Sequence, residues 1–121
     1  MTDMGAAPLR VETRLAGEGT AVLSLAGEVD VSNTARVREA ALQLLSGGTK
    51  KLVVDLSATE YMDSAGLGML VGLLKRLKES GGAMGIAGAR PRVNHLFEIT
   101  GLNQILALYD DVAIALKEVG R

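Results

Sequence analysis

The sequence predicts an α/β fold: a mixed, mostly parallel β-sheet of about five strands with four α-helices, in the order β-β-α-β-α-β-α-β-α. In residues 9–15, uncharged and mostly apolar side chains alternate with charged ones, which is typical of a strand with one solvent-exposed face. Residues 52–56 are mostly apolar, with β-branched residues at their centre and little alternation, which indicates an inner strand covered on both faces. Residues 64–79 repeat their apolar positions at helical spacing. Strands that alternate with helices imply right-handed crossovers and parallel pairing, with the first strand as an antiparallel edge.

The remaining elements follow from turn signals and changes of period. Residues 9–27 are expected to form a hairpin, a helix is expected to end at Gly47-Gly48, and residues 57–63 are expected to be an exit loop. We expect a loose head at residues 1–8 and a single domain over residues 9–119. The other elements are a short strand at 83–88, a helix from Pro91 that ends at Gly101, a last strand at 103–108, and a closing helix at 110–119 capped by Asp110 or Asp111.

The composition restricts the possible functions. The chain has 121 residues, a formal net charge of -1 and 48% hydrophobic residues, which is ordinary for one globular domain and gives no field that attracts nucleic acid. Aromatic residues make up 2% of the chain, so a base-stacking surface is not expected. The chain has no cysteine, no secretory signal and no apolar run of membrane-spanning length, and we therefore expect a cytoplasmic protein without membrane insertion.

Ser64 is the residue that draws attention. It stands between an acidic residue, Asp63, and the start of the helix at 64–79, where we expect it to be the N-cap. The N-terminus of a helix carries about half a positive charge, so it tolerates an added anion. The alternative is that the Asp63-Ser64 pair only caps the helix and has no further role.

The helix at 64–79 has two different faces when one residue is placed every 100°. A broad apolar stripe is expected to pack on the sheet, and the glycines at positions 68 and 72 lie on the other side, where each costs the helix about 1 kcal/mol relative to alanine. A flat outer face would let a partner approach Ser64 closely. The expected inner stripe is Leu67, Leu70, Val71, Leu73, Leu74 and Leu77, and the expected outer face is Ser64, Ala65, Gly68, Met69, Gly72, Lys75, Arg76 and Glu79.

An enzyme is not expected. His95 has no second histidine or cysteine to complete a metal site, and no nucleophile-base pair is visible among Asp55, Glu60 and Asp63. Asp55 is expected to accept hydrogen bonds from nearby backbone. The GxxxxGK[ST] phosphate-binding pattern is absent, so we do not expect a kinase, and we expect no cofactor and no metal.

The segments Leu52-Val53-Val54-Asp55-Leu56-Ser57 and Tyr61-Met62-Asp63-Ser64-Ala65-Gly66-Leu67-Gly68 resemble the signature of STAS domains, the sulphate transporter and anti-sigma factor antagonist family. The likeness extends from about Leu9 to Val119. It includes Gly27-Glu28-Val29-Asp30 and the stretch from Val93 to Leu102. The resemblance implies the STAS fold.

It also implies a stand-alone bacterial anti-sigma factor antagonist, an anti-anti-sigma factor that regulates transcription in a stress response by partner switching. The unphosphorylated form would bind an anti-sigma factor that is also a serine kinase, phosphorylation at Ser64 would end binding, and a metal-dependent serine phosphatase would reverse it. Asp30 matches an acidic position of the family near that serine. The expected partner-binding residues are Asp30, Asp63, Ser64, Ala65, Gly68, Met69 and Gly72.

The competing interpretation is a STAS scaffold or a transporter-associated subunit that binds its partner without phosphate chemistry. In that case Ser64 would serve only as a cap.

Overall fold

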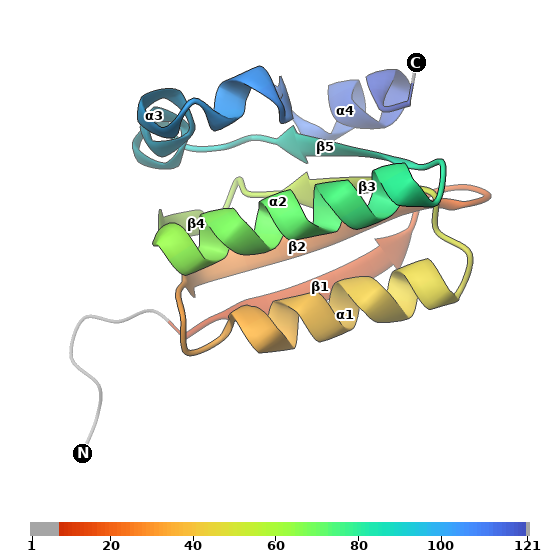
Figure 1. Cartoon of the computed structure of the whole chain (residues 1–121), viewed down its shortest axis with the longest axis horizontal. Helices are drawn as coiled ribbons and strands as arrows, with labels where there is room; N and C mark the ends of the chain where they lie inside the picture. Colours follow the sequence, from red (N-terminus) through yellow and green to blue (C-terminus); the bar gives the residue numbers. More distant parts are fainter. Residues whose placement is uncertain (1–7, 121) are drawn as a thin grey trace.

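The computed structural model describes residues 8–120, which form one β-sheet with helices on both faces (Figure 1). Five strands lie in the order β1-β2-β3-β5-β6, and β4 pairs with β2 outside this row. β1 is antiparallel to β2 and lies at the edge, as predicted, and the other pairs are parallel. The strands are β1 (Arg10–Leu15), β2 (Thr20–Val29), β3 (Lys51–Asp55), β4 (Thr59–Met62), β5 (Ala83–Ala87) and β6 (Ala107–Tyr109).

The helices end where the sequence predicts. Glycines follow α1, and Gly101 ends α3 in the left-handed conformation, with φ of 77°. The side chain of Asp111 caps α4, one of the two caps expected. The helices are α1 (Thr34–Ser46), α2 (Ser64–Glu79), α3 (Pro91–Thr100) and α4 (Val112–Glu118), and a 3₁₀ turn, η1 (Leu102–Gln104), follows α3.

Two expectations about strands are wrong. Residues 57–63 are not only a loop, because Thr59–Met62 form β4 beside the end of β2. The last strand is not at 103–108, because η1 occupies its first residues and only Ala107–Tyr109 pair with β5. Both strands are short, and β4 has two exposed residues at its centre, so neither shows the alternation that a sequence pattern needs.

The core is aliphatic and has two layers. One face of β2 and β3, with Leu23, Leu25 and Leu52, packs against α1, α2 and Phe97 of α3. The opposite face carries a smaller cluster under α4, around Val53. Figure 1 shows α1 and α2 side by side along the first face. α2 is therefore covered by the sheet on one side and by α1 on another. Residues Leu52, Val53 and Val54 are all buried, which confirms that β3 is an inner strand.

Candidate functional site

The start of α2 is held by Asp63 and not by Ser64. Asp63 is the N-cap, and its Oδ1 accepts a hydrogen bond from the amide of Gly66 at 3.1 Å. Ser64 is the first residue of the helix, so the expectation that it is the cap is wrong. Aspartate and serine cap helices about equally well, and the residue that keeps an extended backbone, here Asp63 with φ of -99° and ψ of -175°, takes the role.

The Asp63 carboxylate also joins two loops. Its Oδ2 accepts from the amide of Val31 at 3.1 Å, and its own amide donates to the carbonyl of Val29 at 3.1 Å. β4 makes this possible, because it pairs in parallel with the last residues of β2 and brings the start of α2 beside the β2–α1 loop. The loop that contains Asp30 and the helix start that contains Ser64 therefore lie together.

The β2–α1 loop is itself well ordered by side chains. Asp30 Oδ1 accepts from the amide and the hydroxyl of Ser32, and Asn33 Oδ1 accepts from the amide of Asp30 at 2.9 Å. Asn33 Nδ2 donates to the carbonyl of Glu28 at 2.9 Å. The next residue along from Asp30, Val31, is 76% exposed. The loop thus presents an apolar side chain to solvent on a rigid backbone.

Ser64 is exposed, and among residues 8–120 its hydroxyl has no hydrogen-bond partner. Ala65 beside it is half-buried. Tyr61, on β4, is 42% exposed. The hydroxyl at the first position of this 16-residue helix is therefore accessible to solvent and lies in the positive field of the helix N-terminus.

The glycines of α2 fall into two classes. Gly68 and Gly72 are exposed, and a Cβ added at either would meet nothing within 4 Å. Gly66 is buried, and a Cβ there would lie 2.5 Å from Met62 Cγ and 3.1 Å from a methyl of Val29. Gly68 and Gly72 therefore form the open outer face expected from the sequence, whereas Gly66 is required by close packing against β2 and β4.

Met69 is not on that outer face. Its side chain is 1% exposed and belongs to the core cluster, so the expectation that it contacts a partner is wrong. α1 packs beside α2 and widens the buried stripe beyond the part that faces the sheet. The sequence prediction assumed that only the sheet covers this helix, and it therefore could not place Met69 in the core. The other inner positions are as expected, with Leu67, Leu70, Leu73, Leu74 and Leu77 buried and Val71 half-buried.

The residues considered for enzyme chemistry have local structural contacts. Asp55 Oδ1 accepts from the amide of Ser57 at 3.0 Å, the backbone role expected for it, and Oδ2 accepts from Ser24 Oγ at 3.4 Å. His95 is exposed, with Nδ1 3.6 Å from Glu98 Oε1. Within the part of the chain that the structure describes, no group of three His, Asp or Glu side chains is arranged to hold a metal ion. Nor does any helix of residues 8–120 have the length and apolar character needed to cross a bilayer.

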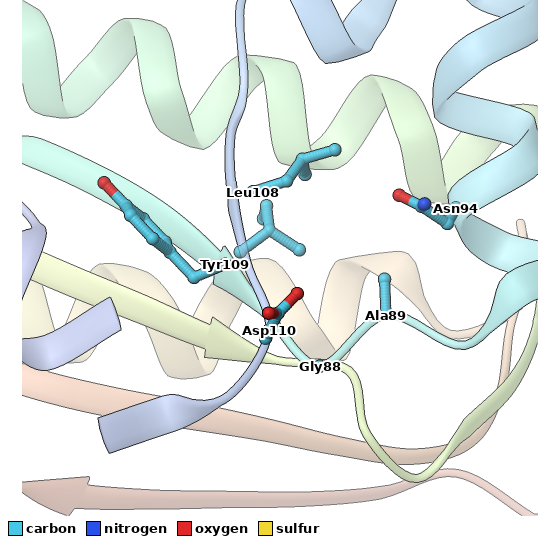
Figure 2. A pocket seen from close by; sticks show the side chains of 7 residues that line it. Gly88, Ala89, Asn94, Leu108, Tyr109 and Asp110 are labelled. Atoms are coloured by element: carbon cyan, nitrogen blue, oxygen red, sulfur yellow. The ribbon is translucent and has the colours of Figure 1, made fainter. Parts of the chain in front are cut away.

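A separate hollow of about 210 Å³ lies at the C-terminal ends of β5 and β6 (Figure 2). Its lining comes from β5, β6 and α3 and includes Asn94, Leu108 and Asp110. Neither Ser64 nor Asp63 lines it. No sequence pattern predicts this hollow, because its lining comes from three elements that only the fold brings together.

Comparison with known proteins identifies the family. Residues 14–115 match the STAS domain family. A Staphylococcus aureus protein named anti-sigma-B factor antagonist is 37% identical over 84 residues, which are 69% of this chain and 78% of the relative.

Solved structures of anti-sigma factor antagonists have a similar fold. An anti-sigma factor antagonist from Mycobacterium paratuberculosis has a TM-score of 0.84 at 28% identity, with 96% of this chain and 99% of that chain covered. The phosphorylated form of the Bacillus cell fate determinant SpoIIAA shares the fold, with a TM-score of 0.73 at 19% identity and coverage of 89% and 97%. The chain therefore belongs to the STAS domain family and is related to the anti-sigma factor antagonists within it.

Proposed function

We propose that this protein is an anti-sigma factor antagonist whose binding is switched off by phosphorylation of Ser64. The observation that carries the proposal is the exposed Ser64 hydroxyl at the first position of α2, left unpaired among the described residues because Asp63 caps the helix. The relatives named anti-sigma-B factor antagonist support the class of partner, an anti-sigma factor. In this proposal that partner is also the serine kinase, and a metal-dependent serine phosphatase restores the binding form.

The surface around Ser64 supports binding to a protein. Val31 and Tyr61 are exposed hydrophobic side chains on the loop and strand that flank the start of α2. Gly68 and Gly72 leave room along the helix for a partner backbone to come close. Exposed apolar side chains near the helix start and small residues along the helix favour a protein partner over a small ligand.

Phosphorylation would change the charge of this surface without unfolding the helix. A phosphate adds roughly -1.5 to -2 charge at pH 7. It would lie beside Asp63 and near the loop that contains Asp30. The helix N-terminus favours an anion at Ser64, so the folded state tolerates the modification. A partner that fits the unphosphorylated surface would have to bury an uncompensated phosphate charge, which weakens binding.

The test has two steps. The protein is incubated with ATP, Mg²⁺ and its cognate anti-sigma factor, and the intact mass and the modified residue are determined. Binding of that factor is then measured for the parent, Ser64→Ala and Ser64→Asp. We expect one phosphate on Ser64, parental binding by Ser64→Ala, and at least roughly tenfold weaker binding by Ser64→Asp.

Ser46→Asp is the matched control, because it adds the same charge at an exposed serine at the far end of α1. It should bind like the parent. The scaffold alternative predicts no phosphate adduct on Ser64 and equal binding by both Ser64 variants, and that result would refute the switch.

A further inference from the structure

The outer edge of β1 is open in the part of the chain that the structure describes. β1 ends the row of strands, and no strand of residues 8–120 pairs with its outer side (Figure 1). Five of its six residues are exposed. An edge strand of this kind presents unpaired backbone amides and carbonyls that another strand can use.

The hydrogen bonds of the hairpin show which backbone groups face outward. The amide of Ala16 donates to the carbonyl of Thr20 at 2.9 Å, across the pair that continues the β1–β2 register. Bonding alternates along an antiparallel strand, so even-numbered residues of β1 bond to β2. The amides and carbonyls of Val11, Thr13 and Leu15 therefore point to the free edge.

The charged side chains of β1 can pair with those of a second β1 strand that runs in the opposite direction. Arg10, Glu12 and Arg14 lie on one face of the sheet, and Val11, Thr13 and Leu15 lie on the other. We propose that β1 pairs in antiparallel fashion with β1 of a second copy, with Thr13 on the two-fold axis. This register places each Glu12 opposite the Arg14 of the other copy, in the closely spaced, non-hydrogen-bonded type of pair.

A neighbouring register is less favourable. With Glu12 on the axis, two carboxylates would face each other, and each Arg10 would face an Arg14, so every charged pair would be repulsive. The charge pattern thus selects the register centred on Thr13 over this one.

The proposed pairing also covers an exposed leucine. Leu15 is 76% exposed and is paired in register with Ala21, whose side chain belongs to the α1-side core. In the dimer it would lie opposite Val11 of the other copy. Val11 lines a groove of about 350 Å³ between β1 and α1, whose wall is apolar at Ala40 and Leu44 and polar at Thr13, Arg36 and Gln43. Leu15 of the second copy would therefore contact Val11 at the apolar part of this groove.

Sedimentation equilibrium on the full chain tests the pairing through charge reversal. We expect the parent to dimerise reversibly, and we expect Glu12→Arg or Arg14→Glu alone to raise the dimer dissociation constant at least about tenfold, because two attractive pairs become repulsive. The double variant should recover to within about threefold of the parent. If the axis lay at Val11, Arg10 would face position 12, and the double variant would stay dissociated.

Single cysteines test the axis directly, because the chain has none of its own. Opposed residues in a hydrogen-bonded pair have Cα atoms about 5.5 Å apart, within disulfide range, so Thr13→Cys should form a covalent dimer on mild oxidation. Leu15→Cys is the control, since its two copies would be about 14 Å apart along the strands. A monomeric parent at all concentrations, or equal cross-linking by both variants, would overturn the proposal. Neither result depends on Ser64 or an anti-sigma factor.

Discussion

The carboxylate of Asp63 lies 3.1 Å from the backbone amide of Val31 and accepts its hydrogen bond, while its other oxygen caps α2. One side chain therefore fixes the helix start that presents Ser64 and the loop that contains Asp30. A carboxylate that accepts two backbone hydrogen bonds contributes more than a neutral cap. The proposed phosphorylation site therefore lies on a helix start that two hydrogen bonds to Asp63 hold in place.

Asp63→Ala should lower the free energy of unfolding by about 1–2 kcal/mol, because it removes the cap and the bond to Val31. Ser64→Ala should change it by less than about 0.5 kcal/mol, since the exposed hydroxyl makes no bond within the described residues. Urea unfolding measures both. Asp63→Asn is the control, as its amide oxygen can still cap. A larger loss for Ser64→Ala than for Asp63→Ala would mean that the cap is misassigned.

The three glycines of α2 should respond differently to alanine. Gly68→Ala and Gly72→Ala should each raise the free energy of unfolding by about 0.5–1 kcal/mol, because the helix gains propensity and the new methyl has space. Gly66→Ala should lower it by about 1–3 kcal/mol, because the methyl collides with Met62 and Val29 in the core. Thermal unfolding of the three variants side by side gives the comparison. Equal changes in the free energy of unfolding for Gly66→Ala and Gly68→Ala would contradict the close packing described around Gly66.

Met69→Ala should lower the free energy of unfolding by about 2–5 kcal/mol, because it leaves a cavity between α2, α1 and the sheet. Lys75→Ala, at an exposed position of the same helix, is the control and should stay within about 0.5 kcal/mol of the parent. Chemical denaturation distinguishes them. If Met69→Ala lowered the free energy of unfolding as little as Lys75→Ala does, Met69 would not be buried and could belong to the partner-binding face.

Thr59→Val should lower the free energy of unfolding by about 1–2 kcal/mol with little change of volume. The buried Thr59 hydroxyl donates to the carbonyl of Leu25 at 2.6 Å, and the substitution leaves that carbonyl without this donor. Because the bond ties β4 to β2, amide hydrogen exchange in residues 59–63 should also become faster. Exchange that matches the parent in this segment would show that β4 does not depend on the bond.

Local patterns determined most of the fold. The alternation in residues 9–15, the apolar run of β3 and the apolar spacing of α2 each span enough residues for the pattern to be visible. Gly101 ends α3 because glycine readily adopts the left-handed conformation, and Asp111 begins α4 because its side chain accepts the amide of Ile114. The position of Ser64 next to Asp63 at the start of a helical pattern was likewise visible in the sequence. The helical spacing also placed Gly68 and Gly72 on the exposed side of α2.

Only the tertiary structure decided which residue caps α2, because the extended conformation of Asp63 is set by β4 pairing with β2. It also decided that Met69 is buried, since the burial of a helix flank depends on the neighbour at that flank, here α1. The free edge of β1 is likewise a property of strand order. These features depend on contacts between residues distant in sequence, whereas the period of a segment reports only the environment averaged along it.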